Sequence, residues 1–247
     1  MTLKLEAIRK GRTTGLEVIR VLVLSVARDR TAGAVAGESE RDERRSAVIG
    51  VVVGLLLLAV GGWIGVRTLG SDNAPDGVAE LLVDARQDLA DGHPEDAHST
   101  LTELIGRASG DPIVLAELYV ERSFALSELG RHEEAIEDAT AAIDLDPDAP
   151  VLLAQAYVNR SWDLAVLGRS GEAVADATRA IVIDSGDPVV VAQAHLHRSF
   201  AMSDLGRIDQ AVADAEAVVM ILPVDHELRI TAEEWLGFLR GDTPRGP

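Results

Sequence analysis

Residues 116–147 read AELYVERSFALSELGRHEEAIEDATAAIDLDP, residues 154–185 read AQAYVNRSWDLAVLGRSGEAVADATRAIVIDS, and residues 192–223 read AQAHLHRSFAMSDLGRIDQAVADAEAVVMILP. Each copy begins 38 residues after the one before it. A fixed period of a few tens of residues is typical of repeat proteins, in which one unit leaves an apolar face that only its neighbour covers. The sequence therefore predicts a stacked array of similar units.

The three copies agree at positions that carry charge, turns and small side chains. An arginine in the first half, a Leu-Gly-Arg triplet, an alanine and an Asp-Ala pair all recur in register. These positions are Arg122, Arg160 and Arg198; Gly130, Gly168 and Gly206; Ala135, Ala173 and Ala211; and Asp138, Asp176 and Asp214. An earlier, divergent copy begins at Val78 and keeps Gly92 and Ala97 in register.

Each unit resembles the tetratricopeptide repeat (TPR), and the resemblance covers roughly residues 78–240. The first half carries Tyr119, Arg122, Ser123 and Leu126 at the spacing of that family, and the Leu-Gly-Arg turn follows. The resemblance implies an all-α solenoid of helical hairpins. Two departures stand out: alanine replaces the usual aromatic residue of the second helix, and the period exceeds the usual 34 by four. Since four residues make about one helical turn, we expect longer first helices.

Arg122, Arg160 and Arg198 each precede an aspartate of the same unit by 16 residues. Such a repeated pair on facing helices satisfies half-buried charge, within a repeat or between repeats. A structural role is therefore expected before a functional one.

Composition limits the possible chemistry. The chain has 247 residues, 47% of them hydrophobic and only 3% aromatic, no cysteine, and a net charge of −18. Without cysteine there is no disulfide or thiolate site. Residues 1–45 carry net +3 and the remainder net −21, which disfavours nucleic acid as a partner. Lysine occurs only as Lys4 and Lys10, and this arginine bias is typical of a high-GC bacterial genome.

The sequence does not predict an enzyme. It holds no glycine-rich phosphate loop, no H-E-x-x-H motif and no G-x-S-x-G elbow. His195 and His197 lie two apart on a helix and point in different directions, so no metal or cofactor is expected.

Residues 47–66, AVIGVVVGLLLLAVGGWIGV, contain no charge and match the thickness of a bilayer as a helix. Arginines are more numerous just before this segment than after it, so we expect the N-terminus inside and the repeats outside the cytoplasm. Residues 16–27 are expected to form either an interfacial helix at the membrane or a small helix or disordered tail. The expected organisation is 1–45 cytoplasmic, 46–67 transmembrane, 68–77 linker, 78–240 repeats with a capping helix from about 228, and 241–247 tail.

Four glycines of the membrane segment, Gly50, Gly54, Gly61 and Gly65, share one helical face. Such a face lets two helices approach closely and would form a homodimer. The alternative is that glycine is simply common in membrane helices.

The resemblance implies that the ninth position of each unit points into a concave groove lined by the first helices. These positions are Arg86, Phe124, Trp162 and Phe200, and one further step reaches Phe238. Four of the eight aromatic residues thus occupy one position, as expected for a groove that grips an apolar or helical peptide. The alternative is that these rings pack against each other as core. The expected polar neighbours are Glu117, Gln155, Gln193, Glu121, Asn159, His197, Glu128 and Asp204.

Those neighbours lack the Lys/Asn clamp with which some proteins of the family hold an acidic C-terminus, so an apolar or basic partner is expected. The leading hypothesis is a membrane-anchored scaffold that binds a protein or peptide in the groove. The alternative is a self-assembling membrane protein that forms a homo-oligomer through its membrane helix and its repeats.

Overall fold

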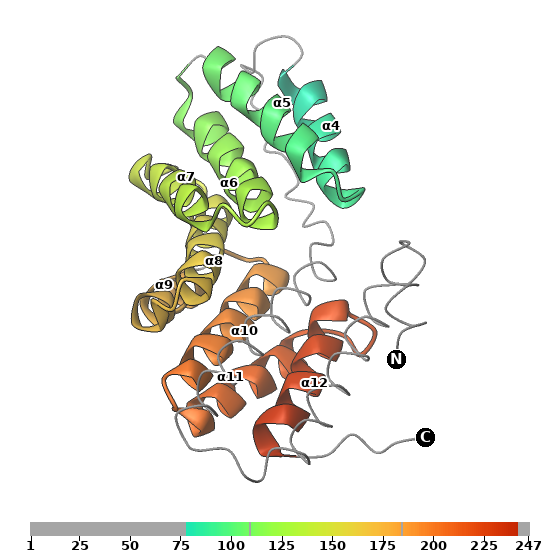
Figure 1. Cartoon of the computed structure of the whole chain (residues 1–247), viewed down its shortest axis with the longest axis vertical. Helices are drawn as coiled ribbons and strands as arrows, with labels where there is room; N and C mark the ends of the chain where they lie inside the picture. The colour runs from blue at the N-terminus through green and yellow to red at the C-terminus, as the bar shows by residue number, and fades with distance from the viewer. Residues whose placement is uncertain (1–77, 109, 184, 242–247) are drawn as a thin grey trace, which may run out of the picture. The chain divides into compact units, whose positions relative to one another are not determined.

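The computed structural model describes residues 78–108, 110–183 and 185–241, and these ranges contain nine α-helices (Figure 1). The helices are α4 (Val78–Ala90), α5 (Pro94–Arg107), α6 (Pro112–Glu128), α7 (His132–Asp144), α8 (Pro150–Val166), α9 (Ser170–Val182), α10 (Pro188–Asp204), α11 (Ile208–Ile221) and α12 (Glu227–Arg240). They form four hairpins, α4–α5 to α10–α11, followed by the single helix α12. The predicted all-α solenoid is confirmed for this part of the chain.

The first helices of the three clear repeats, α6, α8 and α10, each have 17 residues, whereas the second helices have 13 or 14. Each first helix begins at a proline, whose fixed φ suits the first helical position. Asp111 and Asp187 cap α6 and α10 by accepting backbone N–H groups of the first turn. The extra turn expected from the 38-residue period therefore lies at the start of the first helix.

The Leu-Gly-Arg triplets end the first helices in a Schellman motif. Gly130, Gly168 and Gly206 have φ between 72° and 75°, in the left-handed region that glycine reaches without steric cost. The next residue closes the turn: the N–H of Arg131 donates to the carbonyl of Leu126 at 2.9 Å, and Arg169 and Arg207 repeat this bond. The recurring triplet thus fixes the same reversal in each hairpin.

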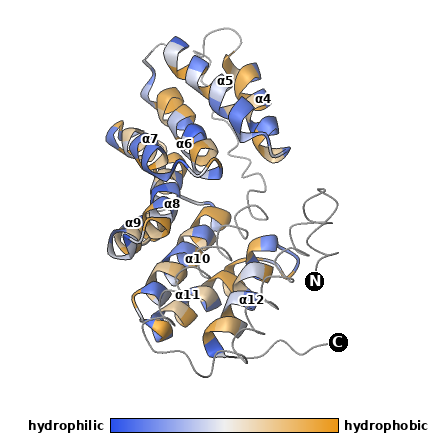
Figure 2. Cartoon of the chain, viewed as in Figure 1, coloured by the Kyte–Doolittle hydropathy of each residue, from blue (hydrophilic) through white to orange (hydrophobic). Residues whose placement is uncertain are grey.

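Successive first helices pack directly on one another: α6 contacts α8, and α8 contacts α10. Each second helix instead packs against the first helices on both sides of it. This arrangement places the first helices in an inner layer and the second helices in an outer one. Close approach depends on fully buried alanines such as Ala116, Ala154 and Ala192. In Figure 2, helices α5, α7 and α9 each carry hydrophobic and hydrophilic sides, as expected of helices covered on one face.

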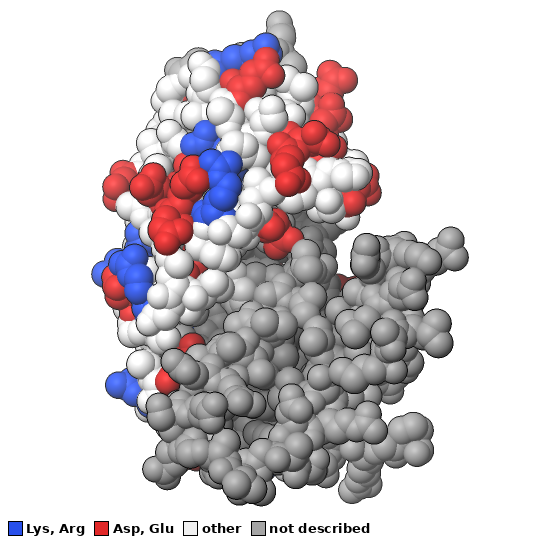
Figure 3. All heavy atoms as spheres, in the orientation of Figure 1, with Lys and Arg blue, Asp and Glu red and all other residues white. Residues whose placement is uncertain are grey.

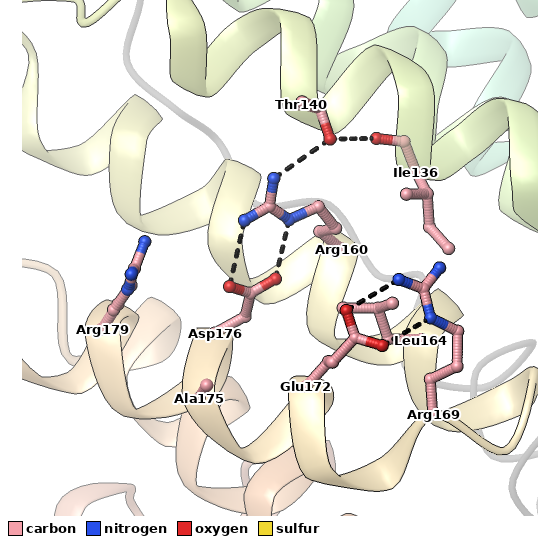
Figure 4. Close-up of a pocket in the computed structure, with 9 residues that line it drawn as sticks. All are labelled: Ile136, Thr140, Arg160, Leu164, Arg169, Glu172, Ala175, Asp176 and Arg179. Atoms are coloured by element: carbon pink, nitrogen blue, oxygen red, sulfur yellow. Dashed lines mark hydrogen bonds and ion pairs between the residues drawn. The ribbon is translucent and has the colours of Figure 1, made fainter.

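A repeated set of polar contacts, here called the outer ladder, joins three helices at each junction. Arg160 of α8 donates to both carboxylate oxygens of Asp176 in α9, at 2.7 and 3.0 Å, and to the hydroxyl of Thr140 in α7 at 3.0 Å (Figure 4). Arg122 and Arg198 make the same contacts one repeat earlier and later. The aspartate lies within the repeat and the threonine in the preceding one, so each guanidinium links two repeats.

The predicted membrane segment 47–66, its glycine face and residues 16–27 lie outside the described residues. Within the described ranges, no helix has the length and apolar character needed to cross a membrane.

We predict that Asp176→Asn lowers the free energy of unfolding by about 2 kcal/mol, because the half-buried Arg160 loses its charged partner. Glu172→Gln is the matched control, since its pair with Arg169 is exposed to solvent and contributes little to stability. Urea unfolding followed by circular dichroism measures both. Equal effects of the two substitutions would contradict a stabilising role for the outer ladder.

Candidate binding groove on the first helices

A second set of contacts, the inner ladder, crosses between neighbouring first helices. Asn159 donates to the hydroxyl of Ser123 at 2.9 Å, and Trp235 Nε1 donates to the hydroxyl of Ser199 at 2.8 Å. Between them in the array, His197 Nδ1 lies 3.2 Å from the carbonyl oxygen of Val158 and 3.5 Å from the hydroxyl of Ser161. The three serines are fully buried. Asn159, His197 and Trp235 occupy one position of the 38-residue period, so one position closes each junction on the inner side.

His197 acts as a hydrogen-bond donor in these contacts. A carbonyl only accepts hydrogen bonds, so Nδ1 carries the proton and the ring donates to Val158. Burial lowers the pKa of His197 to about 4, and the backbone hydrogen bond offsets only part of this effect.

Aromatic rings form a continuous row along the inner layer from α8 to α12. The ring of Trp162 lies 6.4 Å from Phe200, Phe200 lies 4.9 Å from Trp235, and Trp235 stacks on Phe238 at 5.1 Å, all between centroids. The His197 ring joins this row at 5.3 Å from Trp162. Trp162 and Phe200 are each only 4% exposed. The structure therefore brings together three of the predicted groove residues and packs two of them deeply.

The other two predicted groove residues lie apart from this row. Phe124 is half-buried on α6. Arg86 of α4 donates to Glu117 and Glu121 of α6, at 2.7 Å in both cases, and all three side chains are largely buried. At this end of the inner layer, the acidic side chains thus already have a cationic partner.

A buried polar cluster at the turn between α6 and α7 was not predicted. Asp163 is fully buried, and its Oδ1 accepts from the hydroxyl of Ser127 and lies next to His132 Nδ1, both at 2.7 Å. Burial raises the pKa of Asp163, and the hydrogen bond to Asp163 raises the pKa of His132. Glu128 lies beside this cluster: burial and, secondly, the carboxylate of Asp163 raise its pKa to about 7.

Four buried polar atoms among the described residues have no hydrogen-bond partner: Gln155 Oε1, Gln193 Oε1, Asp163 Oδ2 and Trp162 Nε1. All four belong to the first helices α8 and α10. An unsatisfied buried polar atom costs free energy, and an ordered water molecule is the usual partner of such an atom. Three of the four are acceptors.

The outer layer also has a hollow, between α7, α8 and α9 (Figure 4). It is lined by Arg160, Arg169 and Arg179 among other residues, but Asp176 and Glu172 pair with the first two. Arg179 lies over the Tyr157 ring and donates to its hydroxyl at 3.3 Å. The hollow is therefore part of the outer ladder and offers little free charge. Within the described residues, no group of three or more His, Asp or Glu side chains is placed to hold a metal ion.

Two residues that matter here could have been found from the repeat alone. The register that aligns Phe238 with Phe200 also aligns Trp235 with His197. Asp163 replaces the buried alanine that the other repeats have as Ala125 and Ala201, and a carboxylate at a core position is itself a signal.

A family model described as "Tetratricopeptide repeat" matches residues 116–149. The nine described helices extend the same hairpin arrangement from Val78 to Arg240. Residues 116–149 are therefore a TPR, and the array of hairpins that contains it, residues 78–240, is called the TPR domain below. The family resemblance predicted from the sequence is confirmed.

Two solved structures share the fold of this TPR domain. MamA of Desulfovibrio magneticus RS-1 is 19% identical, with a TM-score of 0.51 over 68% of this chain and 88% of that chain. TTC0263, a TPR protein of Thermus thermophilus, is 20% identical, with a TM-score of 0.50 over 90% of this chain and 99% of that chain. At these identities the likeness concerns the fold alone. No curated protein matches the chain in sequence.

We predict that the contribution of His197 to the stability of the TPR domain falls as the pH decreases from about 6.5, the pKa of an exposed histidine, towards 4, the pKa of buried His197. The raised pKa of Glu128 acts in the opposite direction over this range, so the effect of His197 is measured as the difference between the protein and a His197 variant. The folded state favours the neutral ring, whereas the unfolded chain binds a proton at this histidine. At pH 5 this difference lowers the free energy of unfolding by about 2 kcal/mol. His197→Asn installs the residue that Asn159 provides in the preceding repeat and should remove this loss between pH 7 and pH 5. Urea midpoints at the two pH values measure it, and an unchanged pH dependence in the variant would contradict the assignment.

Proposed function

We propose that the chain is a membrane-anchored scaffold whose TPR domain holds a protein or peptide partner on its inner layer, outside the cytoplasm. One observation carries the proposal: a row of aromatic side chains runs along the inner layer from α8 to α12, and Phe124 of α6 is half-buried. Peptide-binding surfaces use aromatic and other apolar side chains as anchors.

The membrane anchor rests on the sequence. Residues 47–66 contain no charge over a length that matches the hydrocarbon core, and the arginines before this segment favour an inside N-terminus. A linker of about ten residues, 68–77, separates the segment from α4. The anchor would hold the groove close to the membrane surface, where a partner is another envelope or secreted protein.

A second candidate function is self-assembly. Val182 of α9 and Met220 of α11 occupy equivalent positions on the outer layer and are 78% and 80% exposed. Large exposed apolar side chains at one repeat position suit contact with another copy, and the glycine face of the membrane segment would bring two copies together.

Photo-crosslinking distinguishes the two candidates. We place p-benzoylphenylalanine at Phe124 or Gln193 on the inner layer, and at Glu137 or Val182 on the outer layer, in the full-length chain in intact cells. The scaffold predicts crosslinks to a different protein from the inner positions alone.

Self-assembly predicts crosslinks to a second copy of the chain from Val182. Crosslinks to other proteins from the outer positions only would contradict the groove as the binding surface. Comparison of each position with and without irradiation controls for copurification.

A further inference from the structure

Two acidic residues extend the aromatic face towards the end of the first helices. Glu128 follows Phe124 by four residues in α6, and Asp204 follows Phe200 by four residues in α10. Side chains four apart lie on the same side of a helix, so each carboxylate lies next to an aromatic ring of the groove. Val166, 40% exposed, has the equivalent place after Trp162 in α8.

Neither carboxylate pairs with a cation among the described residues. Glu128 is half-buried and takes part in no ion pair there, and the charged or titratable groups facing it are Asp163 of α8 and, beyond it, His132 of α7. Asp204 is exposed and accepts only from the hydroxyl of Ser170 at 3.3 Å. Glu117 and Glu121 differ from these two carboxylates, because Arg86 forms ion pairs with both of them.

The surrounding charge agrees in sign with these two carboxylates. The chain after residue 45 carries net −21, and Figure 3 shows acidic side chains, with basic ones among them, on the face of α4 to α7 that it presents. A partner that approaches Glu128 and Asp204 therefore meets negative charge, which favours positive charge on the partner.

We propose that the groove takes a cationic, amphipathic segment of another protein, with apolar side chains beside the half-buried Phe124 and Lys or Arg side chains on Glu128 and Asp204. This assignment rests on the proposed function and names the chemistry of the partner. An acidic segment meets only like charge at these positions.

Binding of a cation beside Glu128 favours the ionised carboxylate. Because burial and Asp163 hold the pKa of Glu128 at about 7 in the free protein, part of the population is protonated at neutral pH. The bound cation lowers this pKa, and the complex releases a fraction of a proton when it forms. This linkage gives the site a signature that a nonspecific charge attraction lacks.

The test is isothermal titration calorimetry on the full-length chain in an uncharged detergent. The probes are two synthetic helical peptides of about four turns with the same leucine face, one with lysine and one with glutamate at every polar position. We expect the lysine peptide to bind at least about 10-fold more tightly. Titrations at pH 7 in two buffers of different ionisation enthalpy measure the released proton.

Three variants locate the site. Glu128→Gln should weaken the lysine peptide and abolish the proton release, and Asp204→Asn should weaken it while keeping the release. Glu137→Gln, an exposed position of α7 with the same charge change, should alter neither.

Equal affinity for the two peptides would overturn the charge assignment and leave the groove as a binding surface. Absence of binding by both peptides would overturn the groove itself. An effect of Glu137→Gln equal to that of Glu128→Gln would overturn the location of the cation.

Discussion

The fold depends on a guanidinium that binds three helices at once. Arg122, Arg160 and Arg198 each join an aspartate of their own hairpin to a threonine of the preceding one. A hairpin of two amphipathic helices does not fix the orientation of its neighbour through apolar contacts alone, since those contacts are non-directional. The planar fork of arginine supplies direction. The same three-helix contact then recurs at each junction of the three clear repeats.

The first helices of the inner layer hydrogen-bond to one another and also form the proposed binding surface. Asn159, His197 and Trp235 close the junctions, each by donating across to the preceding first helix. The deeply packed rings of Trp162 and Phe200 belong to this closure as much as to any groove. What remains for a partner is the half-buried Phe124 and the acidic ends of the first helices, Glu128 and Asp204. The negative charge of these ends favours a cationic partner.

The sequence predicts more about the fold than about the groove. The 38-residue period locates the hairpins, the turn glycines and the longer first helices, because those depend on local backbone chemistry that repeats with the period. The spacing also predicts that Arg160 pairs with a repeated aspartate, and the structure shows that this is Asp176 of the same repeat. The depth of Trp162 does not follow, since it depends on how closely α10 approaches α8. The repeat pattern does not predict the role of Asp163, because the pattern rests on positions that are the same in every repeat. Asp163 differs from Ala125 and Ala201, which have the equivalent position in the neighbouring repeats.

The central claim is that a cationic segment lies on the inner layer beside Glu128 and Asp204. Carbodiimide joins an amine to a carboxylate that it already touches, so it reports this contact directly. The lysine peptide is crosslinked to the full-length chain and the attachment sites are mapped by mass spectrometry. We expect attachment at Glu128 and Asp204. Attachment at Glu133, Glu137 or Glu172 of the outer layer, with none at those two residues, would contradict the claim.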